Sequence, residues 1–195
     1  AKDSNDRTQP SILKMMAMGG EGSPVDRLRQ LHIVPLAISY EYDPCDFLKA
    51  QEFQLRRDVA DWKKGPMDDV VSMQTDIMGY KGHIHYQAAP CIDDWLRALP
   101  DDMPKNEFYV AVAEHLDHEI WRGYRLYPSN FVALDLLRGT DEHADRYTAE
   151  DRQRFEAYLD AQLKKIQLPN PDWAFLRERM LTMYANPAIN QLSVI

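Results

Sequence analysis

The sequence is poor in cysteine and has no long apolar run. Cys45 and Cys91 lie far apart and form no Cys-x-x-Cys pair, which favours a reduced intracellular setting over a disulfide framework. We expect both to be small buried residues. No segment approaches the roughly 20 apolar residues that cross a bilayer, and no signal sequence opens the chain. We therefore expect a cytoplasmic protein that is at most peripheral on the inner face of the membrane.

Positive charge is outnumbered by negative charge. The chain has 23 Lys and Arg against 31 Asp and Glu, a net charge of −8, and the acidic residues are spread along it, which argues against nucleic acid as a partner. It contains no Gly-x-Ser-x-Gly elbow, phosphate-binding Walker loop or dinucleotide fingerprint. These absences argue against hydrolase, nucleoside triphosphatase and dehydrogenase activity, and no cofactor is expected.

The residues that remain are those of a folded protein. Hydrophobic residues make up 45% of the chain, with four Trp, ten Tyr and six Phe. Such a chain can bury enough apolar surface to offset its conformational entropy. Its 195 residues fit a single domain, 1–195.

Two segments are typical of strands. The run 32–40 is nearly continuously apolar, which predicts a strand buried on both faces, although Pro35 is more typical of a sheet edge. Residues 81–88 alternate, with Ile84, Tyr86 and Ala88 on one face, which predicts a half-buried strand.

Most of the other segments have helical periodicity. We expect helices over 46–62, with Asp46 as cap, and over 67–78; beyond Pro104 apolar stripes recur every three to four residues almost to the end. Thr148 and Asp151 form a capping-box pattern. The predicted fold is α/β and helix-rich, with a small, partly incomplete sheet in the N-terminal half covered by helices, followed by a mainly helical C-terminal half.

One segment carries a family resemblance. Residues 33–44 read Ile-Val-Pro-Leu-Ala-Ile-Ser-Tyr-Glu-Tyr-Asp-Pro, which resembles the fourth conserved block of the glycerol-3-phosphate and lysophosphatidate acyltransferase superfamily, an apolar Val-Pro strand followed by a Tyr-Glu pair. Residues 1–9 resemble the stretch that follows the third block, a phosphate-binding turn. The resemblance is specific over roughly the first quarter of the chain.

The resemblance implies a phospholipid-biosynthetic enzyme that transfers an acyl group from acyl-CoA or acyl carrier protein to a glycerol-phosphate or lysophospholipid hydroxyl. In that family the general base is the His of a His-x-x-x-x-Asp motif. None of the six histidines here has Asp five residues later, so we expect no catalytic residue in this chain. It would be the C-terminal portion of such an enzyme, without the catalytic N-terminal part and inactive alone.

The candidate site residues are two cations and a family motif. A substrate that carries a phosphate needs cations at fixed positions, and Lys2 and Arg7, which flank short polar residues, are the candidates, since Arg can hold phosphate through two parallel hydrogen bonds. A solvated, frayed terminus is the alternative reading of the same residues. The family motif Val34, Pro35, Tyr40 and Glu41 would line the pocket.

Two other hypotheses about the function stay open. The first is a non-enzymatic helical interaction module, which would have a closed core. In the acyltransferase fragment, the strand at 34–38 would instead lie inside a sheet with an unfilled cleft and an exposed apolar edge where upstream strands belong. The second is a metal site at His115 and His118, which share a helix face but match no known helical metal signature, so no metal is expected. Clusters among the nine methionines either fill the core or accept acyl chains or a membrane edge.

Overall fold

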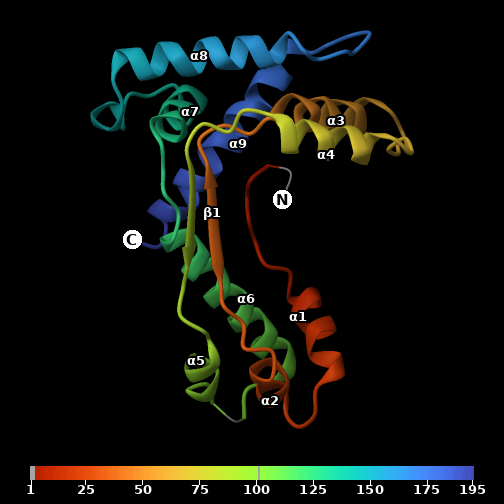
Figure 1. The fold of residues 1–195 in the computed structure, drawn as a ribbon, viewed down its shortest axis with the longest axis vertical. Helices are drawn as coiled ribbons and strands as arrows, with labels where there is room; N and C mark the ends of the chain where they lie inside the picture. Colours follow the sequence, from red (N-terminus) through yellow and green to blue (C-terminus); the bar gives the residue numbers. More distant parts are fainter. Residues whose placement is uncertain (1–2, 101) are drawn as a thin grey trace. The chain divides into compact units, whose positions relative to one another are not determined.

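The computed structural model describes residues 3–100 and 102–195 and is helix-rich, as predicted (Figure 1). One small antiparallel sheet lies in the N-terminal half of the described chain, and the C-terminal half is helical. The elements in order are α1 (Pro10–Met16), η1 (Ala17–Gly19), α2 (Pro24–Arg29), β1 (Leu36–Tyr40), α3 (Asp46–Asp58), α4 (Asp68–Met78), β2 (Ile84–Ala88), α5 (Asp93–Arg97), α6 (Lys105–Arg122), α7 (Pro128–Arg138), η2 (Ala144–Arg146), α8 (Ala149–Leu163) and α9 (Trp173–Leu192).

The chain forms two compact units, each with its own core. Among the described residues, unit 1 contains 3–5, 40–84 and 126–192, and unit 2 contains 6–39, 85–100, 102–125 and 193–195. The expectation of a single domain stays a prediction, which unfolding measurements can test.

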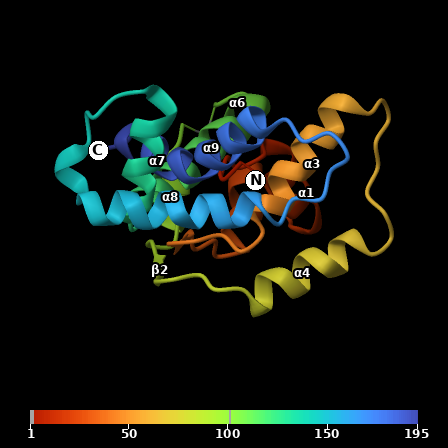
Figure 2. The ribbon, with the colours of Figure 1, turned by 90° about the horizontal axis from the view of Figure 1, so that it is seen from above.

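The core of unit 1 is built by α3, α7, α8 and α9. Figure 2 shows α7, α8 and α9 packed together and α4 apart from them. No residue of α4 is buried. The predicted capping box at Thr148 is present, since its side chain accepts from Asp151 N–H. The buried core side chains include Val132, Leu134, Phe155, Leu159, Leu176, Met180 and Tyr184.

The core of unit 2 lies among α1, α2, α5 and α6. Its largest contribution is the predicted stripe of α6, and the buried side chains include Leu13, Leu28, Leu96, Phe108, Tyr109, Val112 and Leu116. Nearly all of the sheet belongs to this unit. β1 lies against the end of α6, because a Cβ placed on Gly123 would be 2.8 Å from Ala37 Cβ.

The first strand departs from prediction in its start and its burial. It begins at Leu36 rather than His32, because Pro35 has no N–H to donate and His32 has a φ of +47°. It is buried on one face only: Ala37 and Ser39 are buried, whereas Leu36 and Ile38 are exposed.

The apolar face of the sheet is its exposed face. Hydrogen bonds from Glu41 N–H to His83 C=O and from Ala89 N–H to Pro35 C=O share one register, which places Ile38 opposite Tyr86. Directly opposite residues point to the same side of a sheet. The prediction that Ile84 and Tyr86 share a face therefore agrees with the register, but both are exposed.

Two further expectations were wrong. The helix that begins at Asp46 ends at Asp58, not Trp62, because Val59 is extended and Asp61 has a φ of +55°. Cys45 is buried as expected, but Cys91 is exposed.

Candidate functional site

The Glu41 carboxylate lies directly after β1, on the Tyr-Glu motif, and it binds His83. Glu41 Oε2 accepts from His83 N–H at 3.0 Å and lies 2.7 Å from His83 Nδ1. Glu41 is 13% exposed, and His83 is 84% exposed. The carboxylate thus fixes the orientation of an imidazole whose other nitrogen, Nε2, can meet solvent.

Gly82 makes this arrangement possible. Its φ is +64°, and a Cβ there would lie 2.5 Å from Glu41 Oε2. The left-handed backbone and the missing side chain let the turn fold over the carboxylate. On the other side, Ser129 Oγ donates to Glu41 C=O at 3.2 Å.

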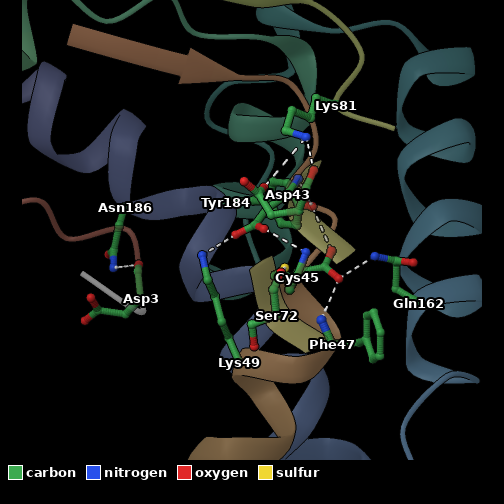
Figure 3. Close-up of polar contacts among 12 residues, drawn as sticks. Asp3, Asp43, Cys45, Phe47, Lys49, Ser72, Lys81, Gln162, Tyr184 and Asn186 are labelled. Atoms are coloured by element: carbon green, nitrogen blue, oxygen red, sulfur yellow. Dashed lines mark hydrogen bonds and ion pairs between the residues drawn. The ribbon is translucent and has the colours of Figure 1, made fainter. Parts of the chain in front are cut away.

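A second polar cluster lies in the turn 43–46 and is covered by α8 and α9 (Figure 3). Asp46 is fully buried. Its carboxylate accepts from Tyr184 Oη at 2.8 Å, Gln162 Nε2 at 2.6 Å and Phe47 N–H at 2.6 Å. Burial raises the pKa of Asp46 to about 6, and the hydrogen bonds from Tyr184 and Gln162 act in the opposite direction.

Asp46 was predicted as an ordinary helix cap, and the structure gives it a different role. The phenol of Tyr184 also accepts from Asp43 N–H at 3.0 Å. Burial and the nearby Asp46 carboxylate raise the pKa of Tyr184 well above its ordinary value, so this phenol stays protonated. The cluster therefore ties the turn after β1 to α9 through buried hydrogen bonds.

The same turn brings three metal-capable groups together. Ligand atoms of Asp43, Cys45 and Asp76 lie within 4.8 Å of one another. However, Lys49 Nζ lies 2.5 Å from Asp43 Oδ2 (Figure 3), and Lys81 Nζ lies 3.8 Å from Asp76 Oδ1. Burial raises the pKa of the Cys45 thiol to about 11, and the thiol donates to Ser72 C=O. Two lysines and a protonated thiol leave little affinity for a cation.

Of the two residues predicted to bind phosphate, only Arg7 lies in the part of the chain that the structure describes. Lys2 lies outside the described residues. The Arg7 guanidinium lies 5.8 Å from the centre of the Trp121 ring. The segment around Arg7 is anchored rather than frayed, because Thr8 N–H donates to Asp117 and Trp121 Nε1 donates to Asp6 C=O.

The predicted pocket residues divide between the two units. Val34 and Pro35 belong to unit 2, where Val34 is exposed and Pro35 is buried. Tyr40 and Glu41 belong to unit 1. Tyr40 is 38% exposed.

The two histidines considered for a metal each lie near an aromatic ring. The His115 ring stacks on Trp95 with 3.9 Å between ring centres and 4° between the planes. Burial lowers the pKa of His115. His118 is exposed and lies 5.9 Å from Trp121.

Sequence reasoning missed three histidine–carboxylate pairs. They are Glu41–His83, Asp93–His32 and Asp135–His143. The partners are 42, 61 and 8 residues apart, so no fixed local spacing indicates them. Only the alternation at 81–88, which predicts a strand that could pair with the first, offered an indirect signal for His83.

No protein-family profile, curated protein or solved structure matches the chain.

Proposed function

We propose that this chain is the C-terminal part of a phospholipid-biosynthetic acyltransferase of the glycerol-3-phosphate and lysophosphatidate type. The whole enzyme transfers an acyl group from acyl-CoA or acyl carrier protein to a glycerol-phosphate or lysophospholipid hydroxyl. The chain alone is inactive, since its sequence lacks the His-x-x-x-x-Asp motif of that family.

The observation that carries this proposal is the exposed apolar face of the sheet. Ile38 is 41% exposed and Tyr86 is 57% exposed; Leu36 in β1 and Val34, two residues before it, are exposed as well. Among the described residues β1 pairs only with β2, so its other edge is open. A two-stranded sheet is marginal by itself, and an apolar face beside an open edge is suited to further strands and their covering helices.

This face also bears on the alternative of a helical interaction module. That alternative predicted a closed core without an exposed apolar edge. The exposed side chains of β1 and β2 instead favour the acyltransferase assignment. In that enzyme Val34, Pro35, Tyr40 and Glu41 line the pocket, and Arg7, together with Lys2, helps to bind the substrate phosphate.

Contact with a membrane surface is part of the proposal. None of the described helices is long and apolar enough to cross a membrane. The apolar side chains of α4 and its flanks are exposed, and these are Met67, Val70, Val71, Met73, Ile77, Met78 and Tyr80. Such a helix can lie on a lipid interface, where its apolar side chains leave water.

The test is an acyl-transfer assay that follows free thiol released from acyl-CoA. We expect turnover with glycerol-3-phosphate or lysophosphatidate when the gene is expressed with its upstream coding sequence, and background release from the present chain. In the longer protein, Ile38→Asp should abolish turnover by placing a charge on the covered face. Val110→Asp, at an exposed position of α6, should not. Turnover by this chain alone, or no turnover by the longer protein, contradicts the proposal.

A further inference from the structure

Unit 2 contains a cavity that involves none of the residues carrying the family resemblance. It lies among α2, α5 and the start of α6 and has a volume of about 520 Å³. Small-molecule sites in proteins typically measure about 300–1,000 Å³. The cavity is therefore large enough for a metabolite or for the end of a lipid.

Its charge is opposite to that of the whole chain. Arg29, Arg97 and Lys105 line the cavity, and Asp26 is the only carboxylate among its described lining residues. Asp26 already acts in a capping box, where its Oδ2 accepts from Ser23 N–H and Oγ. In a protein of net charge −8, three cations around one hollow form a local site for an anion.

The two arginines are available to a ligand. Arg29 Nε is buried and has no hydrogen-bond partner among the described residues, and an unpaired buried donor is costly. Arg29 Nη1 lies 3.9 Å from Asp26, which is beyond hydrogen-bond distance. Arg97 pairs at 3.0 Å with Asp94, which is 91% exposed. Such exposed pairs contribute little and can exchange for a bound anion.

The remaining wall is apolar. Val25, Met103 and the buried Phe108 line the same cavity as the three cations. An inorganic anion leaves such a wall in contact with water, whereas a hydrocarbon group covers it. The ligand that fits both parts has a charged head and an alkyl portion.

We propose that this cavity binds a phosphate monoester carrying an alkyl chain, with Arg29, Arg97 and Lys105 on the phosphate and Val25, Met103 and Phe108 against the chain. A phosphate monoester carries nearly two negative charges at neutral pH. This charge suits a cavity lined by three cations and by one carboxylate, that of Asp26, which is already hydrogen-bonded in its capping box. Arginine binds phosphate through parallel hydrogen bonds, and Arg29 Nε is a donor for such a bond. The cavity residues that carry this inference are separate from those that carry the acyltransferase proposal, although lysophosphatidate, an acceptor named there, belongs to the same ligand class.

Calorimetric titration of the 195-residue chain with octyl phosphate, ethyl phosphate and inorganic phosphate tests this proposal. We expect affinity to rise about fourfold for each methylene that enters the cavity. Arg29→Met and Arg97→Met should each weaken octyl phosphate binding about tenfold or more. Arg122→Met, which removes the same charge from an exposed position outside the cavity, should leave binding unchanged.

Several results would overturn the proposal. They are equal binding by the Arg29→Met and Arg97→Met variants, equal affinity for inorganic and octyl phosphate, and octanol or octanoate binding as tightly as octyl phosphate. If Arg29→Met fails to fold by circular dichroism, Arg97→Met decides, because the Arg97 side chain is largely exposed. Sedimentation with phosphatidylcholine vesicles with and without phosphatidate distinguishes the ligand's sources. Phosphatidate-dependent pelleting that Arg97→Met abolishes assigns a membrane headgroup, and octyl phosphate binding without pelleting assigns a soluble ester.

Discussion

At the scale of single residues, Asp46 has the most unusual environment in the turn after β1. It is fully buried, and its partners are two side chains and one backbone N–H rather than a cation. Burial of an ionised carboxylate is unfavourable, and this is why its pKa is raised to about 6. Asp46 therefore links the stability of unit 1 to pH.

We predict that Asp46→Asn removes a pH-dependent part of the stability. Between the pKa of the unfolded chain, 3.8, and about 6 in the folded protein, the folded protein holds the proton that the unfolded chain has released. The free energy of unfolding therefore falls as pH rises through this window, by about 2–3 kcal/mol for this group. Urea unfolding at pH 4, 5, 6 and 7 measures the slope. Asp94→Asn, at an exposed position, is the control, and an unchanged slope in Asp46→Asn contradicts the prediction.

Alanine substitutions at two glycines can separate the stability cost of backbone strain from the stability cost of a steric clash. Gly82 and Gly139 have nearly equal φ values, +64° and +67°, but only Gly82 has atoms within 4 Å of an added Cβ. Gly139→Ala should therefore cost about 1 kcal/mol for the left-handed backbone alone. Gly82→Ala should cost about 1–3 kcal/mol more, because Glu41 and the Tyr42 ring must move to admit the new Cβ. Denaturant midpoints give both values, and equal losses would show that Glu41 does not restrict this turn.

At the scale of elements, α4 differs from the other long helices because it contributes no buried residue. Helices of this length are marginal in water without tertiary packing. The contact with a lipid surface that is proposed above would account for its exposed apolar side chains.

We predict that Ile77→Glu weakens binding to phospholipid vesicles, because Ile77 is 72% exposed and a charge opposes insertion of the helix face. Gln74→Glu adds the same charge at an exposed polar position of α4 and should have a smaller effect. Vesicle flotation measures the bound fraction. Equal losses for the two variants would indicate a general effect of charge, and no loss would exclude α4 as the contact.

The strands show what pattern reasoning can and cannot reach at this scale. Residues 81–88 alternate as expected of a strand, and a strand forms there. Alternation distinguishes two faces, but it does not say which of them is covered. The side with Ala37 is covered by the end of α6, whereas the more apolar side with Ile38 and Tyr86 is not.

At the scale of the whole molecule, the chain passes repeatedly between two units that have separate cores. Both strands cross the division, since Tyr40 and Ile84 belong to unit 1 and the rest of β1 and β2 to unit 2. The segments that build each unit are connected through the other unit, so unfolding of one core would free the ends of the segments that form the other core. We therefore expect the two units to unfold together.

We predict a single unfolding transition. Phe155→Ala, in the core of unit 1, should cost about 3–5 kcal/mol and shift the whole transition. Val112→Ala, in the core of unit 2, should shift the same transition by a smaller amount. Circular dichroism and amide hydrogen exchange of each unit give the comparison. Two transitions, or protection lost in only one unit, would identify two domains.

The sequence largely determines which segments are helical and, where a capping signal is present, where a helix begins. The 3.6-residue period marks the buried stripe of α6, and the Thr148–Asp151 capping box fixes the start of α8, because these signals act between residues within one or two turns. The tertiary structure alone decided the covered face of the sheet, the burial of Asp46 and the pairing of Glu41 with His83. Each depends on which distant segment packs against the residue, and the residues next to it in the sequence do not specify that segment.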